Sequence, residues 1–177
     1  MYYLVNEWSL DNERLRKDLE QIGLPIQSLQ LENILDSIFF NQKVDSPLHM
    51  TSLPLPPFWE VYANGDIVSD GMKRGKIDCF QDRPQRVKKV DWYDPDGHCS
   101  MSDHYDRSGS LFLKEVWSAD ERHLSIYTND RMGKLYLFHQ HDRAIYQAID
   151  GLEQGFSSIE EAKKALLQEA LLQAETV

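Results

Sequence analysis

The chain has 177 residues, of which 41% are hydrophobic and 27% are charged. This composition is typical of one folded globular domain and excludes a disordered or fibrous chain. No apolar stretch approaches the ~18 residues that a membrane-spanning helix needs, and the start lacks a secretory signal. The net charge of −10 disfavours binding to nucleic acid, so we expect a cytoplasmic protein without a nucleic-acid partner.

Residues 1–45 have the pattern of a β-α-β unit. An apolar strand is predicted over Tyr2–Val5, and Asp11 can cap the helix that comes next and that ends at Gly23. A second extended run continues to Leu31. Doubly wound nucleotide-binding domains begin in this way, yet no glycine-rich phosphate loop accompanies the unit. We therefore predict a Rossmann-like start without a cofactor.

Residues 46–58 carry four prolines, at positions 47, 54, 56 and 57. Proline removes a backbone donor and fixes φ, which forbids a regular helix here and favours an extended, semi-rigid chain. This segment is predicted to connect the β-α-β unit to a second domain.

Residues 59–142 show short aromatic and β-branched runs that alternate with turn signals. Four turns are predicted at Asn64-Gly65, Asp94–Gly97, Asp106–Gly109 and Asp130–Gly133. Between residues 86 and 133 the spacing repeats every twelve residues, so that each block holds one strand and one turn. Successive blocks should pair as an antiparallel β-meander.

Both faces of this predicted sheet carry apolar side chains. Alternation places Leu111 and Leu113 on one face of their strand, and Phe112 and Val116 on the other. A sheet that is covered by helices on one side and by a partner on the other would explain this pattern. The candidate protein-interaction residues are Trp59, Trp92, Tyr93, Tyr105, Phe112, Val116, Trp117, Tyr127, Tyr136 and Phe138.

Residues 143–177 are predicted to be a helical segment. Arg143–Ile149 is a first helix candidate, and a longer helix is predicted over Ser157–Glu175. Ser157 with Glu160 and Ser158 with Glu161 each offer a capping box at its start. The complete prediction is an α+β fold with a β-α-β start, an antiparallel meander and a C-terminal helix.

No catalytic or metal-binding pattern stands out. His139 and His141 lack further ligands at a diagnostic spacing, and alternation places Asp103 and His104 on opposite faces of one strand. The Asp94–Gly97 stretch lacks the later ligands of a calcium loop. The chain has two cysteines, Cys79 and Cys99, which do not form the dense disulfide pattern of a secreted domain. We therefore expect no enzyme activity, cofactor, metal or disulfide.

The motifs resemble a known family, the GtfB-type stabilising subunits of the accessory-secretion O-glycosyltransferase. The similarity lies in Pro47–Met50, Leu53–Val61, Lys89–Gly97 and Asp103–Gly109. It implies a β-meander inserted in a Rossmann start and a non-catalytic role as co-activator and chaperone. The implied partners are a catalytic glycosyltransferase subunit, joined through the meander domains, and a serine- and threonine-rich adhesin that is glycosylated before export. Attachment to the membrane would then be peripheral, through these partners.

Two alternatives remain open from the residues. Rings repeated with glycine-containing turns, such as Trp92, Tyr105 and Trp117, also occur in modules whose aromatic side chains stack on sugars. A small enzyme would have to use the region of His98, Asp103 and His104. Self-association of the chain is a further possibility that the pattern leaves open.

Overall fold

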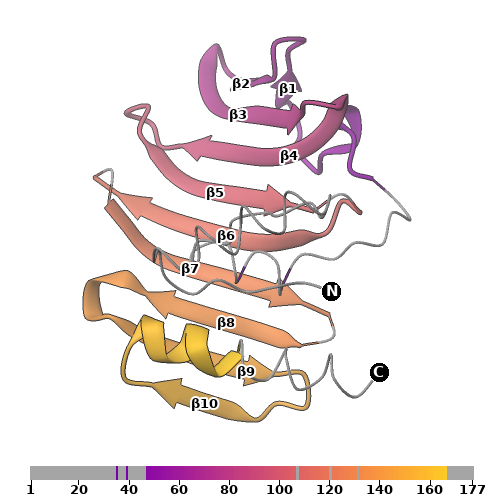
Figure 1. The fold of residues 1–177 in the computed structure, drawn as a ribbon. Helices are drawn as coiled ribbons and strands as arrows, with labels where there is room; N and C mark the ends of the chain where they lie inside the picture. Colours follow the sequence, from indigo (N-terminus) through magenta and orange to yellow (C-terminus); the bar gives the residue numbers. More distant parts are fainter. Residues whose placement is uncertain are drawn as a thin grey trace, which may run out of the picture. The chain divides into compact units, whose positions relative to one another are not determined.

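Figure 1 shows the fold in a computed structural model, which describes residues 35, 39, 47–106, 108–119, 121–130 and 132–166. The chain divides into two compact units, one of residues 39–162 and one of residues 1–38 and 163–177. The first unit contains the whole sheet. The β-α-β unit expected over residues 1–45 lies outside the described residues, except for the helical Leu35 and Phe39. The division into four segments stays a prediction.

The first unit is built on one antiparallel sheet whose ten strands lie side by side in chain order. The meander predicted from the turn signals is thereby confirmed, and the four predicted turns each join two neighbouring strands. The strands are β1 (Glu60–Val61), β2 (Asp66–Ser69), β3 (Met72–Phe80), β4 (Arg83–Tyr93), β5 (Cys99–Tyr105), β6 (Leu111–Ser118), β7 (Glu121–Asn129), β8 (Gly133–Phe138), β9 (Arg143–Ala148) and β10 (Glu153–Phe156).

Two of the turns require glycine for a reason beyond their conformation. Gly65 and Gly133 both have positive φ, at 87° and 112°. A Cβ atom at Gly65 would lie 2.6 Å from the carbonyl oxygen of Ile77, and one at Gly133 would overlap that of Gln147. Because the turn backbone packs directly on the neighbouring strand, any side chain at these positions would push the two strands apart.

The prediction of a helix over residues 143–149 is wrong, since Arg143–Ala148 forms strand β9. A short 3₁₀ turn, η2 (His139–His141), ends at Asp142, whose left-handed φ of 46° reverses the chain. Ala144 and Tyr146 are buried while Arg143 and Ile145 are exposed, which is the two-residue period of a strand. The segment also pairs with β8 and β10, and the sheet continues to Phe156.

The proline-rich segment covers part of the sheet as well as leading into it. It contains one 3₁₀ turn, η1 (Met50–Ser52), and a second turn at Pro57-Phe58, where Phe58 has a φ of 69°. The described part of the segment contains no regular helix, as the prolines predict. The backbone N–H of Val87 donates to the carbonyl of Leu48 at 2.9 Å. Leu53 is buried in the core that forms between this segment and the sheet. The segment therefore belongs to the folded body.

The first core lies on one face of strands β2–β4. Its buried members are Leu53, Ile67, Ile77, Val87 and Val90. Leu48, Met50, Leu55 and Trp59 from the proline-rich segment and the start of the sheet pack against it, as do Trp92 and Tyr105. The rings of Trp59 and Trp92 lie 6.4 Å apart in a tilted arrangement. Burial of these side chains holds the N-terminal half of the sheet together.

The second core lies on the opposite face of the sheet, over strands β6–β9. The register shows the change of side. Trp92 packs against the first core, but the residues that pair in line with it on the next three strands, Met101, Val116 and Leu124, are not buried. The buried apolar side chains of this half belong to the alternate rows. They are Leu113, Tyr127, Leu135, Leu137, Ala144 and Tyr146. Phe39 packs on Tyr127 with ring centroids 5.4 Å apart.

A β-bulge in β4 makes the first core possible. Val87 and Val90 are three positions apart and would face opposite sides of a regular strand. Asp78 pairs with Lys89 but Cys79 pairs with Val87, so that Lys88 is an extra residue in β4. The extra residue returns Val87 to the side of Val90, and both are buried at 1% and 0% exposure.

A helix comes after β10 and is described from residue 159 to 166. The N–H of Glu161 donates to the Ser158 hydroxyl at 3.1 Å, which is half of the predicted capping box. The Glu161 carboxylate accepts hydrogen bonds from the N–H and the hydroxyl of Ser157. The N–H of Ile159 donates to Asp142 at 3.1 Å and ties the helix start to the turn before β9.

Candidate protein-interaction site

The ten candidate interaction residues fall into three groups. Trp59, Trp92 and Tyr105 pack against the first core, and Phe112 and Tyr127 are buried at 8% and 6% exposure. These five are structural in the folded chain. Tyr93 and Trp117 are half-buried, and Lys73 and Arg122 lie over their respective rings. Val116, Tyr136 and Phe138 are half-buried and lie on the sheet face that the second core leaves uncovered.

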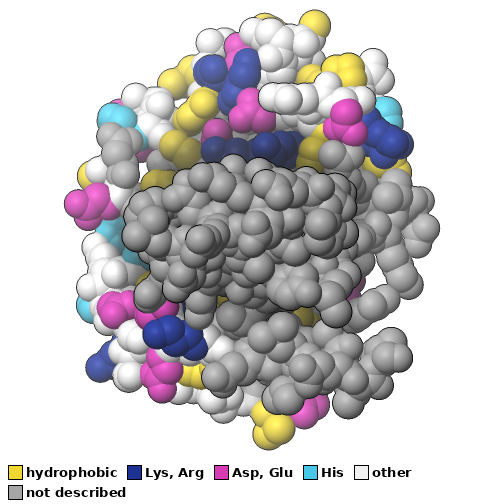
Figure 2. Space-filling model, in the orientation of Figure 1, with side chains coloured by type: hydrophobic (Ala, Val, Ile, Leu, Met, Phe, Trp, Pro, Cys, Tyr) yellow, Lys and Arg dark blue, Asp and Glu magenta, His cyan; other side chains and the backbone are white. Residues whose placement is uncertain are grey.

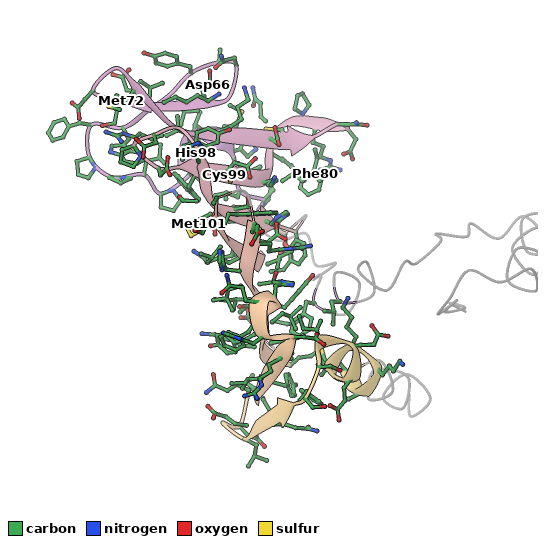
Figure 3. The ribbon with its side chains drawn as sticks, turned by 90° about the vertical axis from the view of Figure 1, so that its left-hand side faces the viewer. Asp66, Met72, Phe80, His98, Cys99 and Met101 are labelled. Atoms are coloured by element: carbon green, nitrogen blue, oxygen red, sulfur yellow. The ribbon has the colours of Figure 1, made fainter. Side chains whose placement is uncertain are left out.

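These last three residues belong to a larger apolar surface that sequence reasoning identified only in part. Register adds Leu124, Ile126 and Ile145 to the same face. We call this surface the half-exposed apolar face, and it consists of Val116, Leu124, Ile126, Tyr136, Phe138 and Ile145. Ile145 is 39% exposed. In Figure 3, Met101 points to this side, and no described element lies over the side chains that continue this face on the later strands.

The matching region of the first half, on the side away from its core, is charged instead. We call it the charged face; it consists of Asp66, Lys73, Lys76, Asp78, Lys89 and Asp91. Asp66 pairs with Lys73 at 2.8 Å and with Lys76 at 3.2 Å. The two ammonium groups lower the pKa of Asp66 to about 2. Charged side chains lie over the upper strands in Figure 2.

Polar side chains occupy the middle of the sheet, where the two cores change sides. Asp91, Ser102, Glu115 and Ser125 form one row across four strands. Ser102 donates to Asp91 at 2.5 Å, and Lys89 pairs with the same carboxylate oxygen at 2.8 Å. We call this row the polar row. A charged or hydroxyl group is buried at little cost when it has such partners.

Glu115 is the central charge of the polar row. Its carboxylate contacts His104 Nε2 at 2.9 Å and Arg122 Nη1 at 2.7 Å. Burial raises the pKa of Glu115, but the hydrogen bonds and charges of His104 and Arg122 outweigh burial and leave the pKa below its usual value. The carboxylate therefore stays ionised and joins β5, β6 and β7.

Asp103 holds the corresponding place on the other face. It accepts a hydrogen bond from Trp92 Nε1 at 2.8 Å and pairs with Lys114 at 3.1 Å. Burial, together with the Asp103 charge, raises the pKa of Tyr105 to about 12. His104 lies on the opposite face, as the alternation predicted. The two side chains therefore lie on opposite sides of the sheet and do not belong to one site.

Cys99 departs from simple alternation along β5. Alternation alone would put Cys99 on the face of Met101 and Asp103, yet its Sγ contacts Ser102 Oγ at 3.6 Å and Asp91 at 4.0 Å on the other face. The cause is a bulge, since Trp92 pairs with Met101 but Tyr93 pairs with Cys99. Cys79 and Cys99 are free thiols. No three His, Cys, Asp or Glu side chains in the described part of the chain are placed to hold a metal ion.

Comparison with known proteins decides the family. Residues 59–156, more than half of the chain, match the family described as the GtfB middle domain. The chain belongs to this family. The match begins just before β1 and ends with β10, so the family domain coincides with the ten-stranded sheet. The resemblance seen in the motifs is thereby confirmed.

Curated relatives include three streptococcal proteins named UDP-N-acetylglucosamine–peptide N-acetylglucosaminyltransferase stabilizing protein GtfB. The chain is 37% identical over 82 residues to that of Streptococcus gordonii, covering 44% of this chain and 18% of the relative. It is 32% identical over 144 residues to that of Streptococcus parasanguinis, covering 72% and 32%. The Streptococcus pneumoniae relative is 29% identical over 158 residues, covering 80% and 35%. The chain thus spans about a third or less of these relatives.

Two solved structures share the fold. One is a GtfA/B complex bound to UDP and GlcNAc, with a TM-score of 0.69 at 21% identity, covering 99% of this chain and 42% of the other. The second contains accessory secretory proteins 1, 2 and 3 of Streptococcus pneumoniae, with a TM-score of 0.59 at 13% identity, covering 89% and 33%. The similarity supports the single-sheet meander as the fold of the family. In the described part of this chain, no helix is long and apolar enough to cross a membrane.

Proposed function

We propose that this chain is a non-catalytic module that docks on a protein O-glycosyltransferase and stabilises it, so that serine-rich adhesins are glycosylated before accessory-Sec export. The curated relatives are named as stabilizing proteins of such an enzyme, which supports the assignment. The chain itself belongs to the GtfB middle domain family. A cytoplasmic location and a serine- and threonine-rich acceptor are parts of the same proposal.

The half-exposed apolar face carries the proposal. Six apolar side chains from four neighbouring strands lie on one side of the sheet, and Ile145 alone leaves 39% of its surface accessible. A contiguous apolar patch on a protein surface is typical of a site that binds another protein. Trp92 and Tyr105, two of the rings that a sugar was expected to stack on, instead pack against the first core. The surface therefore favours a protein partner over a glycan.

The first test is the molar mass of the chain alone and with the catalytic glycosyltransferase subunit from the same source, by light scattering after size exclusion. We expect a hetero-complex. Separate peaks at micromolar concentrations would contradict the proposal, and a homo-oligomer of the chain alone would assign the face to self-association. A variant that combines Val116→Lys with Ile126→Lys should abolish the complex, because two charges would be buried without partners.

A matched control variant carries Asp78→Lys on the charged face, where the added charge remains in water. This control should bind as the native chain does. Both variants should retain the circular dichroism spectrum and a cooperative thermal transition. Equal loss of binding in the control would show that the effect comes from net charge and would remove the assignment of the face.

A further inference from the structure

A groove opens at one end of the sheet, where β8 ends, β9 begins and β10 ends. Its volume is about 800 Å³. Its lining residues are Phe138, Ala144, Ile145, Gly155 and Phe156, together with the polar His141, Arg143 and Ser157. Phe138 and Ile145 lie on the half-exposed apolar face, whereas the register places Ala144 and Phe156 on the face of the second core. We call it the β10 groove. A space of this size accepts one or two protein side chains rather than a single ion.

The groove continues the half-exposed apolar face. Phe138 and Ile145 belong to both surfaces, and Ile145 pairs with Gly155 of β10. A side chain at position 155 would lie on the same face as Ile145, but glycine leaves that space empty. A Cβ atom added there would meet no heavy atom within 4 Å. The missing side chain therefore keeps the floor of the groove open.

The charged residues beside the β10 groove indicate which kind of ligand it could bind. Arg143 is exposed and has no ion pair among the described residues, and the same is true of His141. The acids nearest in the chain have partners of their own: Asp142 accepts from the N–H of Ile159, Asp150 from the N–H of Leu152, and Glu153 from the side-chain amide of Gln147. The exposed guanidinium of Arg143 beside an apolar floor complements an apolar side chain next to a carboxylate.

We propose that the β10 groove anchors the glycosyltransferase partner by taking one large apolar side chain, with a neighbouring Asp or Glu of the partner on Arg143. This inference rests on the proposed function and adds the chemistry of the anchor to it. The guanidinium offers two parallel donors to a carboxylate, and the apolar floor removes the anchor side chain from water. The rest of the half-exposed apolar face supplies the surrounding contacts.

The test measures binding of the catalytic subunit to four variants of the full chain by isothermal titration calorimetry. Gly155→Phe fills the groove, and Arg143→Glu reverses the charge of its rim. Each should weaken binding about tenfold or more, since each removes a central anchor contact. Gly155→Ala adds only a methyl group to open space, and Lys88→Glu makes the same charge change at the exposed bulge of β4. Both controls should bind as the native chain does.

The outcomes separate this inference from the proposed function. If the native chain does not bind the catalytic subunit, the proposed function is wrong and the anchor with it. If the native chain binds and Gly155→Phe and Arg143→Glu bind equally well, the docking role stands and the groove has no part in it. If Gly155→Phe loses binding and Arg143→Glu does not, the apolar anchor stands and a partner carboxylate on Arg143 is excluded. If Gly155→Phe does not fold, Ile145→Lys replaces it, because Ile145 also lines the groove and is exposed enough to accept a charge in the folded chain. This variant should weaken binding as well.

Discussion

The two halves of the sheet solve the same packing problem on opposite sides. The first half buries Ile67, Ile77 and Val90 under the proline-rich segment and leaves a charged face. The second half buries Leu113, Leu135 and Leu137 on the other side and leaves an apolar face. One continuous ladder of strands joins them. The side that a strand exposes is therefore set by what covers it locally, and among the described strands it is the second half that leaves an apolar face half-exposed.

Replacing buried side chains should produce the largest effects in both halves. Ile77→Ala and Leu135→Ala should each lower the free energy of unfolding by about 2–5 kcal/mol, because each leaves a cavity in a packed core. Asp78→Ala and Ile145→Ala, on the exposed sides, should cost less than about 1 kcal/mol. Urea unfolding monitored by circular dichroism measures all four. A large loss at Ile145 would mean that the apolar face is already covered in the isolated chain.

Deleting Lys88 tests whether the first core needs the bulge itself. Without Lys88, Val87 and Val90 are two positions apart and share one face of a regular strand. Both side chains then stay in the core, so we expect the free energy of unfolding to fall by less than about 1 kcal/mol. Lys88→Ala keeps the bulge and serves as the control, and urea unfolding measures both. A loss of about 1.5–3 kcal/mol in the deletion alone would mean that Val87 has left the core.

Glu115→Gln examines the polar row between the two halves. The variant should lose about 1–3 kcal/mol at neutral pH, because His104 and Arg122 would lose their carboxylate partner. The folded state lowers the pKa of Glu115, so its contribution is complete above the ordinary value of 4.5 and disappears as the pH falls through the lower, folded value. The variant should therefore show a flatter fall in stability below pH 4.5. Parallel acid profiles would contradict this role.

Lys73→Met should have the smallest effect, confined to the charged face. Lys73 is the largest cause of the low pKa of Asp66, so that pKa should rise from about 2 towards its ordinary value of 3.8. An NMR titration of the carboxyl carbon measures the change. Little change in stability is expected, because ion pairs in water contribute little. An unchanged pKa would show that Lys76 and Asn64 suffice to hold the carboxylate.

Local signals in the sequence predicted the meander well. Asn64-Gly65 and Asp94–Gly97 mark their turns through residues that tolerate positive φ, and the twelve-residue spacing predicted consecutive strands. The reversal of the chain at Asp142 was not predicted, so residues 143–149 were expected to form a helix in place of β9. The β-bulges were not predicted either. They change the face of Val87 and Cys99 through one extra residue, which alternation cannot detect.

The candidate site was predicted only in part. Val116, Tyr136 and Phe138 do lie on the half-exposed apolar face, whereas Phe112 and Tyr127 belong to the buried side. Apolar character is the same in a core and in an interface, so the sequence pattern could not separate them. The register that pairs Val116 with Leu124 and Tyr127 with Leu113 makes the distinction. Neither β10 nor the open space beside Gly155 was predicted, because no strand was expected between residues 149 and 157.

The strand order has a consequence for how the chain folds. Every strand pairs only with strands that are its neighbours in the sequence, from β1 to β10. Loop closure then costs little entropy at each step, so the sheet can grow hairpin by hairpin from any stable pair. Its energetics should resemble those of a repeat protein, in which each unit contacts only the next. Such a sheet can gain or lose a hairpin during evolution without rewiring the strands that remain.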